Sequence, residues 1–216
     1  MQTFRDVETA AYCPRKLYYR RRDPETPDPP ERVAAVRELA FRYEELLEDD
    51  DALARAPVAL TPTQYRSRLG RTRATVDDWD AICDPHSREV HLSGQDCRGV
   101  AHKVLDDPPR PSLVFTGDPP TNGVWEPQTV RLVAAAKALA WERERPVETA
   151  IAEYPAHGVV REVPLTTRRT AAYRSALRTA RAIDAPPSRI DNDAKCPPCD
   201  YSDECGVRTR SLRSML

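Results

Sequence analysis

Three of the six cysteines lie close together near the C-terminal end of the sequence. Cys196 and Cys199 form a Cys-x-x-Cys pair, and Cys205 follows after five further residues. Such a turn lets two thiolates reach one metal ion, and the prolines at 197 and 198 stiffen it. Three local ligands leave a tetrahedral site one ligand short, and Cys13 is the natural fourth. We therefore expect one metal centre that joins the two ends of the chain.

The spacing of these cysteines leaves the kind of site open. A disulfide framework is the covalent alternative, but the chain has no features of a secreted protein. Spacing alone favours a structural zinc site with four thiolates, because such sites are commoner than iron–sulfur clusters. Cys83 and Cys97 lack ligand-like spacing, and we expect them to be ordinary buried thiols.

Basic residues are unevenly distributed along a chain whose formal net charge is only −1. The segment 166–182 contains no acidic residue and carries five arginines: Arg168, Arg169, Arg174, Arg178 and Arg181. The last three recur at helical spacing on one face, opposite Tyr173, Leu177 and Ala180. This helix is either a solvated face or a surface that contacts the phosphates of DNA.

The overall composition indicates a single globular domain, residues 1–216. No apolar run approaches the roughly 20 residues that a membrane-spanning helix needs, so we expect no membrane partner. The N-terminus lacks the basic and apolar regions of a signal peptide, which predicts a cytoplasmic protein. Within the domain, residues 13–22 and 190–216 are expected to form a small subdomain around the four cysteines.

Patterning predicts helices and strands that must position these residues. Thr3 and Asp6 resemble a capping box that opens a helix ending at Ala11. Prolines at 24, 27, 29 and 30 predict a loop, and Asp77, Asp78 and Asp80 a solvated turn around Trp79. Further helices are expected at Pro14–Arg22, at Glu31–Glu48, from Pro62 toward Trp79, from Pro127 with apolar positions through Trp141, and after a cap at Thr167. Strands are expected at Glu89–Leu92, Arg98–Leu105, Ser112–Phe115, Glu148–Tyr154 and Gly158–Leu165.

The two cysteine segments together resemble a known family. A lone cysteine in CPRKLYY and a C-terminal KCPPCDYSDEC resemble the CRISPR-associated iron–sulfur exonucleases, which are RecB-like nucleases. The resemblance implies that Cys13, Cys196, Cys199 and Cys205 hold a 4Fe-4S cluster rather than zinc. It also implies an α/β fold of the PD-(D/E)XK nuclease type, in which a mixed sheet is flanked by helices. The element order agrees with that core.

The family's cutting site departs from the expected pattern in three places. Its carboxylates hold manganese or magnesium, which activates water beside the attacked phosphate. Histidine, His102, replaces the aspartate of a Gly-x-x-Asp strand, and the strand Ser112–Phe115 lacks the Glu-x-Lys. Leu132 replaces the tyrosine of a Gln-x-x-x-Tyr helix. His102 remains a candidate catalytic residue, since it could ligate a transition metal by itself. Relocated carboxylates could come from the nearby aspartates Asp77, Asp78, Asp80 or Asp106.

Three functions stay open on the sequence. The first is a DNA-binding iron–sulfur protein of this family whose cutting site has degenerated. The second is an active exonuclease, dependent on manganese or magnesium, that acts on single-stranded DNA or single-stranded ends. The third is an interaction protein, stapled by zinc or a cluster, that has no role on DNA. Proteins of CRISPR adaptation or of DNA repair are the expected partners of the first two.

Overall fold

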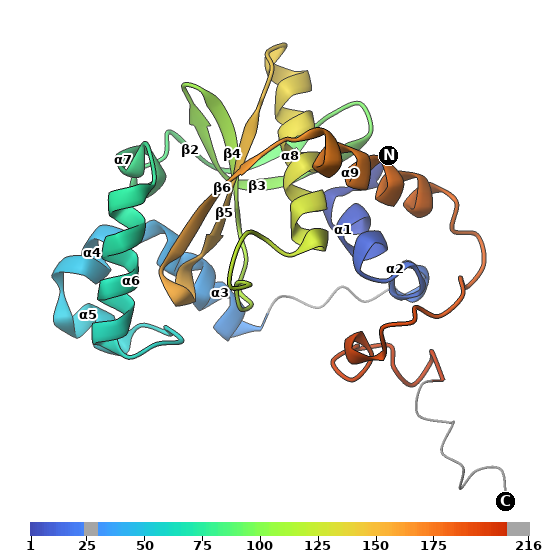
Figure 1. The fold of residues 1–216 in the computed structure, drawn as a ribbon, viewed down its shortest axis with the longest axis horizontal. Coiled ribbons are helices and arrows are strands. Elements are labelled where there is room, and N and C mark those ends of the chain that lie inside the picture. Colours follow the sequence, from blue (N-terminus) through green and yellow to red (C-terminus); the bar gives the residue numbers. More distant parts are fainter. Residues whose placement is uncertain (24–29, 207–216) are drawn as a thin grey trace, which may run out of the picture.

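A mixed sheet of six strands forms the centre of the molecule (Figure 1). The computed structural model describes residues 1–23 and 30–206, so most of the loop predicted from the early prolines lies outside it. The strands are β1 (Gln2–Thr3), β2 (Ser87–Ser93), β3 (Cys97–Asp106), β4 (Pro109–Val114), β5 (Thr149–Tyr154) and β6 (Val159–Pro164). All five predicted strands are confirmed within a few residues. The short strand β1 had no pattern in the sequence.

The strand order joins the early and late parts of the chain in one sheet. Strands β2, β3 and β4 form an antiparallel meander, and β5 then pairs in parallel with β4. The connection between β4 and β5 is helix α8 (Glu126–Arg143), which begins near the predicted Pro127. Strand β6 closes one edge, and β1 pairs in parallel with the start of β3. The expectation of an α/β fold with a mixed, open sheet flanked by helices is confirmed.

One face of the sheet is covered by α8, by α1 (Phe4–Tyr12) and by α9 (Thr167–Arg181) (Figure 1). The predicted capping box of α1 is present, because Thr3 and Asp6 each accept a bond from the other's backbone N–H. Phe4 then packs directly on Gly99 of β3, where an added Cβ would lie only 2.4 Å from the Phe4 ring. This close approach gives the glycine a packing role in addition to its place in the family pattern.

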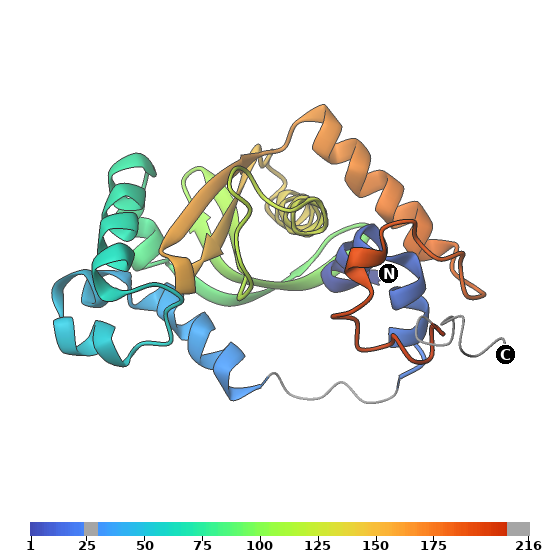
Figure 2. The ribbon, with the colours of Figure 1, turned by 60° about the horizontal axis from the view of Figure 1, so that its bottom comes forward.

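The opposite face is covered by short helices from residues 31–83, seen at the far side of the sheet from α9 in Figure 2. They are α3 (Glu31–Glu38), the 3-10 turn η1 (Leu39–Phe41), α4 (Tyr43–Glu48), α5 (Asp50–Arg55), α6 (Pro62–Thr75) and α7 (Trp79–Cys83). The single helix predicted at Glu31–Glu48 was wrong, because the chain leaves helical geometry at Arg42 (φ −131°, ψ 18°). No helix in the described part of the chain is long and apolar enough to cross a membrane.

Several other predictions need correction. The helix from Pro62 ends at Thr75, and Asp78, in left-handed conformation, separates it from α7. The cap of α9 is Thr166 rather than Thr167, since its hydroxyl accepts from Arg169 N–H at 3.4 Å. Helix α2 (Pro14–Arg20) ends two residues early. Trp141, predicted as an apolar position of α8, is 58% exposed.

A fully buried ion pair connects the sheet to the helices of residues 31–83. Lys103 on β3 and Glu153 on β5 are both 0% exposed, and their charged atoms lie 2.8 Å apart. The Lys103 ammonium also donates to the Ala40 carbonyl (2.6 Å) and the Ile82 carbonyl (2.8 Å), so all three of its donors are used. The lysine thus binds a carbonyl of the 3-10 turn Leu39–Phe41, just before the break in helical geometry at Arg42.

Removing one partner of this pair should destabilise the protein strongly. Lys103→Met leaves a buried carboxylate without its cation, which typically costs about 3–5 kcal/mol. The free energy of unfolding, measured with urea, should fall by that amount, and adding Glu153→Leu should recover part of the loss. Arg42→Met is the control, since Arg42 and Glu45 form a pair that is 39% and 46% exposed. That variant should lose less than about 1 kcal/mol, and an equally small loss for Lys103→Met would contradict the assignment.

Candidate metal centre and strand-end site

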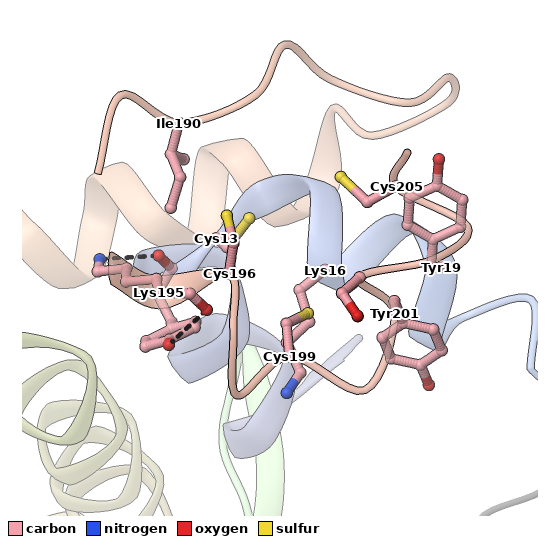
Figure 3. Close-up of a pocket in the computed structure, with 11 residues that line it drawn as sticks. Cys13, Lys16, Tyr19, Ile190, Lys195, Cys196, Cys199, Tyr201 and Cys205 are labelled. Carbon is pink, nitrogen blue, oxygen red and sulfur yellow. Dashed lines mark hydrogen bonds between the residues drawn. The ribbon is translucent and has the colours of Figure 1, made fainter. Parts of the chain in front are cut away.

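The four predicted ligands line one small cavity between the start of the chain and its C-terminal part (Figure 3). The cavity has a volume of about 30 Å³. Cys13, Cys196, Cys199 and Cys205 all contribute to its wall, together with Tyr12, Lys16, Tyr19, Ile190, Lys195, Tyr201 and Ser202. The structure therefore brings together residues that are more than 180 positions apart in the sequence.

Local turns present each cysteine to the cavity. Cys13 is the extended residue (φ −160°) between α1 and α2, where Pro14 occupies the first position of the second helix. In the C-terminal part, Cys199 N–H donates to the Cys196 carbonyl at 3.0 Å. Cys205 N–H donates to the Tyr201 carbonyl, also at 3.0 Å. The first of these turns is the one that the Cys-x-x-Cys spacing predicts.

The sulfur atoms do not surround a single point. Figure 3 shows the sulfurs of Cys13 and Cys196 close together, with the sulfurs of Cys199 and Cys205 each set apart from them. Within the described residues, no three side chains of histidine, cysteine, aspartate or glutamate are arranged to hold one ion. The donor set fits a soft metal or an iron–sulfur cluster chemically, because thiolates are the ligands that such centres prefer. Ligation by the four cysteines stays a prediction.

Polar contacts attach the C-terminal segment 184–206, called the tail below, to helices α1 and α2. Lys195 Nζ donates to the Tyr12 carbonyl (2.9 Å), and the Tyr12 hydroxyl donates to the Lys195 carbonyl (3.2 Å). Lys16 pairs with Asp200 at 3.0 Å, and the Tyr19 and Tyr201 rings are stacked with centroids 6.2 Å apart. These bonds define where the tail lies along the two helices.

Apolar burial contributes almost nothing to the position of the tail. Among the side chains described between 184 and 206, none is buried. The small apolar cluster beneath it consists of Ala10, Leu17 and Ala180, with Ile183 partly buried against it. A segment that cannot bury an apolar core usually requires a disulfide or a metal to be stably ordered. The four thiols are the groups in this tail region that could provide such a cross-link.

The second candidate site lies where strands β3 and β4 separate. Their backbone pairing begins at Lys103 and Ser112, so Val114 has no partner on β3. Its N–H donates instead to Nδ1 of His102 at 3.0 Å. His102 is only 4% exposed, and burial together with the charges of Arg131 and Arg37 lowers its pKa to about 3. The imidazole is therefore neutral and acts as an acceptor between the two strands.

An ion pair that sequence reasoning missed lies near His102. Arg131 of α8 and Glu8 of α1 approach to 3.3 Å, and both side chains are about four-fifths buried. The guanidinium also lies 5.8 Å from the centre of the Phe115 ring. Burial raises the pKa of Glu8 even though Arg131 opposes the shift. No local pattern could have indicated this pair, because its members are 123 positions apart.

The positions at which the resemblance would place metal ligands are apolar or neutral in space as well as in sequence. Leu113, Val114 and Phe115 are at most 5% exposed and belong to the apolar cores, as does Leu132. Two of the suggested replacement carboxylates are paired elsewhere: Asp78 with Arg110, and Asp106 with Arg143. Glu8, the carboxylate nearest to Arg131, already has a cation. One carboxylate and one histidine do not form the acidic site that magnesium requires.

The arginine-rich helix has the orientation that its spacing predicts. Tyr173, Leu177 and Ala180 are at most 5% exposed and face the core. Arg174 and Arg178 are exposed on the opposite side, and so is Arg168. Arg181 pairs with Asp96 at 2.6 Å, and Arg169 donates to the Pro164 carbonyl at 2.7 Å. The five arginines therefore differ, and three of them present charges to solvent.

The remaining two cysteines lie away from the cavity. Cys97 is buried as predicted, whereas Cys83 is only partly buried and contacts Glu44 at 3.7 Å. Burial raises the pKa of Cys83 to about 12, which keeps its thiol protonated and unreactive.

Comparisons with known proteins do not identify the chain. No protein-family model matches it, and no curated protein matches its sequence.

Protonation of His102 should make the protein less stable in acid. Its pKa is about 3 in the folded protein and near 6.5 in the unfolded chain. At pH values between these two, the imidazole is therefore protonated in the unfolded state and neutral in the folded state. Stability therefore falls with pH below 6.5, by up to about 1.4 kcal/mol per pH unit.

His102→Gln removes this dependence while keeping a side-chain acceptor. Urea unfolding at pH 7 and pH 5 should show a loss about 2 kcal/mol smaller in the variant than in the wild type. The exposed His86, replaced by Gln, serves as the control and should leave the wild-type loss unchanged. Equal losses in wild type and His102→Gln would show that this imidazole titrates normally.

Proposed function

We propose that this chain is a DNA-binding iron–sulfur protein of the CRISPR-associated exonuclease type, with a degenerate cutting site. The proposal depends most on the four cysteines, which come from both ends of the chain and line one cavity. In this proposal Cys13, Cys196, Cys199 and Cys205 hold a 4Fe-4S cluster. The cluster supplies a cross-link between the tail and helices α1 and α2.

The composition of the tail supports this assignment. Its described side chains are all at least partly exposed, and its contacts to α1 and α2 are polar. Each such hydrogen bond replaces one to water and contributes only about 0.5–1.5 kcal/mol net. Ordering more than twenty residues costs about 1–2 kcal/mol of backbone entropy per residue. A covalent metal cross-link offsets this cost in a way that the polar contacts do not.

The order of strands and helices supports the nuclease-type core. The meander β2–β3–β4, the helix α8 and the parallel strand β5 follow the order expected for a PD-(D/E)XK fold. The point where β3 and β4 separate is where that fold would place its metal ligands. Here it contains neutral His102 and the pair of Glu8 with Arg131. These residues do not fit a catalytic manganese or magnesium ion, so we propose binding without cutting.

The exposed arginines of α9 support contact with DNA. Arg168, Arg174 and Arg178 lie along one helix and are exposed, and no ion pair joins them to the described residues. Arginines in such an arrangement can each neutralise one phosphate of a nucleic acid. The chain as a whole has a formal net charge of only −1, so this helix is a local rather than a general basic surface. Single-stranded DNA, or a duplex with single-stranded ends, is the proposed partner.

Iron content tests the proposed cluster. Protein purified without oxygen should be brown and should contain about four irons per chain. Cys196→Ala should lose the colour and most of the iron, and its tail should become sensitive to proteases. Cys83→Ala removes a thiol outside the cavity and should keep both colour and iron. A colourless protein with one zinc per chain would overturn the cluster assignment. Only the prediction that the four cysteines ligate a metal would then remain.

The salt dependence of DNA affinity tests the proposed surface. Replacing Arg168, Arg174 and Arg178 by Gln should reduce the slope of log affinity against log salt for single strands by about 2. The control replaces exposed arginines of the other helical layer, Arg32, Arg55 and Arg71, and should leave the slope unchanged. Equal effects of the two triple variants would show that α9 is only a solvated face.

The same preparation distinguishes binding from cutting. With manganese or magnesium present, the wild-type protein should retain labelled DNA at full length. Release of nucleotides, abolished by His102→Ala, would replace this proposal with an active exonuclease that uses a rearranged site.

A further inference from the structure

Two tryptophans are exposed at the two ends of helix α8. Trp125, just before the helix, exposes 51% of its surface, and Trp141 near its end exposes 58%. The third, Trp79, is 6% exposed and stacks on Tyr43 in the core. Exposed tryptophan faces are large apolar surfaces that water solvates poorly, so the two on α8 are candidates for binding a flat ligand.

Trp125 is held in one orientation by its own loop. Its indole N–H donates to the Asp118 carbonyl at 2.8 Å. Arg161 of β6 fixes the same loop by donating to the carbonyls of Gly123 and, at 3.2 Å, Thr121. His157 Nε2 also lies 3.0 Å from Asp118 Oδ1. The only polar atom of the ring is thus satisfied, and its exposed part is hydrocarbon that needs little further ordering when a ligand binds.

The direction of α8 places Trp125 at the end of the sheet where β3 and β4 separate. Strands β4 and β5 are parallel, so the helix between them must begin at the end where β4 finishes. That end contains the bond from Val114 to His102. Arg131 follows Trp125 on the same helix. Trp141 lies near the other end of α8, about 24 Å away at 1.5 Å per residue.

We propose that Trp125 is a stacking platform for an unpaired nucleobase of a bound DNA strand. This inference rests on the proposed function and names the part of the surface that selects single strands. Every base presents a flat aromatic face, and stacking on an aromatic side chain contributes about 1–3 kcal/mol per base. In a duplex those faces are covered by neighbouring base pairs. The platform therefore favours unpaired DNA.

The surroundings of Trp125 favour a base over a protein partner. The exposed large apolar side chains in the described part of the chain are Met1, Trp125 and Trp141. Protein interfaces surround an aromatic anchor with further apolar contacts that exclude water, and a single exposed ring does not supply them. A nucleobase needs only one face, with cations nearby for its phosphates. Arg161, which donates to two carbonyls of the loop that carries Trp125, places a cation beside this loop.

Two readouts with matched variants test the platform. A short oligothymidylate should quench the tryptophan fluorescence of the wild type on binding. Trp125→Ala should lose most of this quenching and weaken binding roughly tenfold or more. Trp141→Ala removes an equally exposed indole from the other end of α8 and should preserve both quenching and affinity. Trp125→Phe, which keeps an aromatic face, should retain most of the affinity and shows that the loss is not misfolding.

The outcomes separate this inference from the proposed function. If wild-type protein binds no DNA at any salt concentration, both fail. If it binds single strands, and Trp125→Ala binds as tightly with its quenching intact, only the platform is overturned. A blunt duplex should bind more weakly than the single strand and should be insensitive to Trp125→Ala. Equal sensitivity of duplex and single strand would also contradict base stacking.

Discussion

The buried pair of Lys103 and Glu153 is the interaction that joins the sheet to the helical layer of residues 31–83. Transferring two charges out of water costs several kcal/mol each, and this cost is offset only when every donor and acceptor is used. Lys103 meets this condition by bonding to Glu153 and to carbonyls of Ala40 and Ile82. Ser112 on the intervening strand β4 completes the set by donating to Glu153 at 2.5 Å. These bonds fix strands β3, β4 and β5 relative to one another and to Ala40 and Ile82 in the helical layer.

The fixed position of Lys103 also constrains the side chain of its neighbour on β3, His102. His102 precedes Lys103 on β3, at the point where pairing with β4 stops. Because Lys103 is fixed on one side of the strand, the imidazole of His102 is left to satisfy the Val114 N–H between the strands. A carboxylate at this position would accept the same bond but would also carry a buried charge beside apolar Phe115. Neutral histidine satisfies the backbone without needing a metal.

Local patterns in the sequence predicted those parts of the fold that local interactions determine. Strand-like runs between turns rich in Gly, Pro and Asp placed the strands, Pro127 placed the start of α8, and the Thr3–Asp6 box placed α1. Local patterns predicted neither the break at Arg42 nor the bond that the nearby Ala40 carbonyl accepts from Lys103, far away in sequence. Cysteine spacing indicated candidate ligands and the structure gathers them around one cavity, but spacing cannot show their final geometry. The pair of Glu8 and Arg131 has no local signal at all.

Helices α1 and α2 contact both the tail and the arginine-rich helix α9. Helix α1 packs against both α8 and α9, and Arg21, just after α2, donates to the Ala180 carbonyl near the end of α9 at 2.7 Å. The tail attaches to these same helices through Tyr12, Lys16 and Tyr19. A cross-link through Cys13 would therefore limit the motion of α2 and, through Arg21, of the end of α9. Because the tail has no buried core, its loss of order would expose polar contacts rather than the main core. Under the proposed function, loss of the cross-link would therefore weaken the support of the end of α9 while the sheet stays folded.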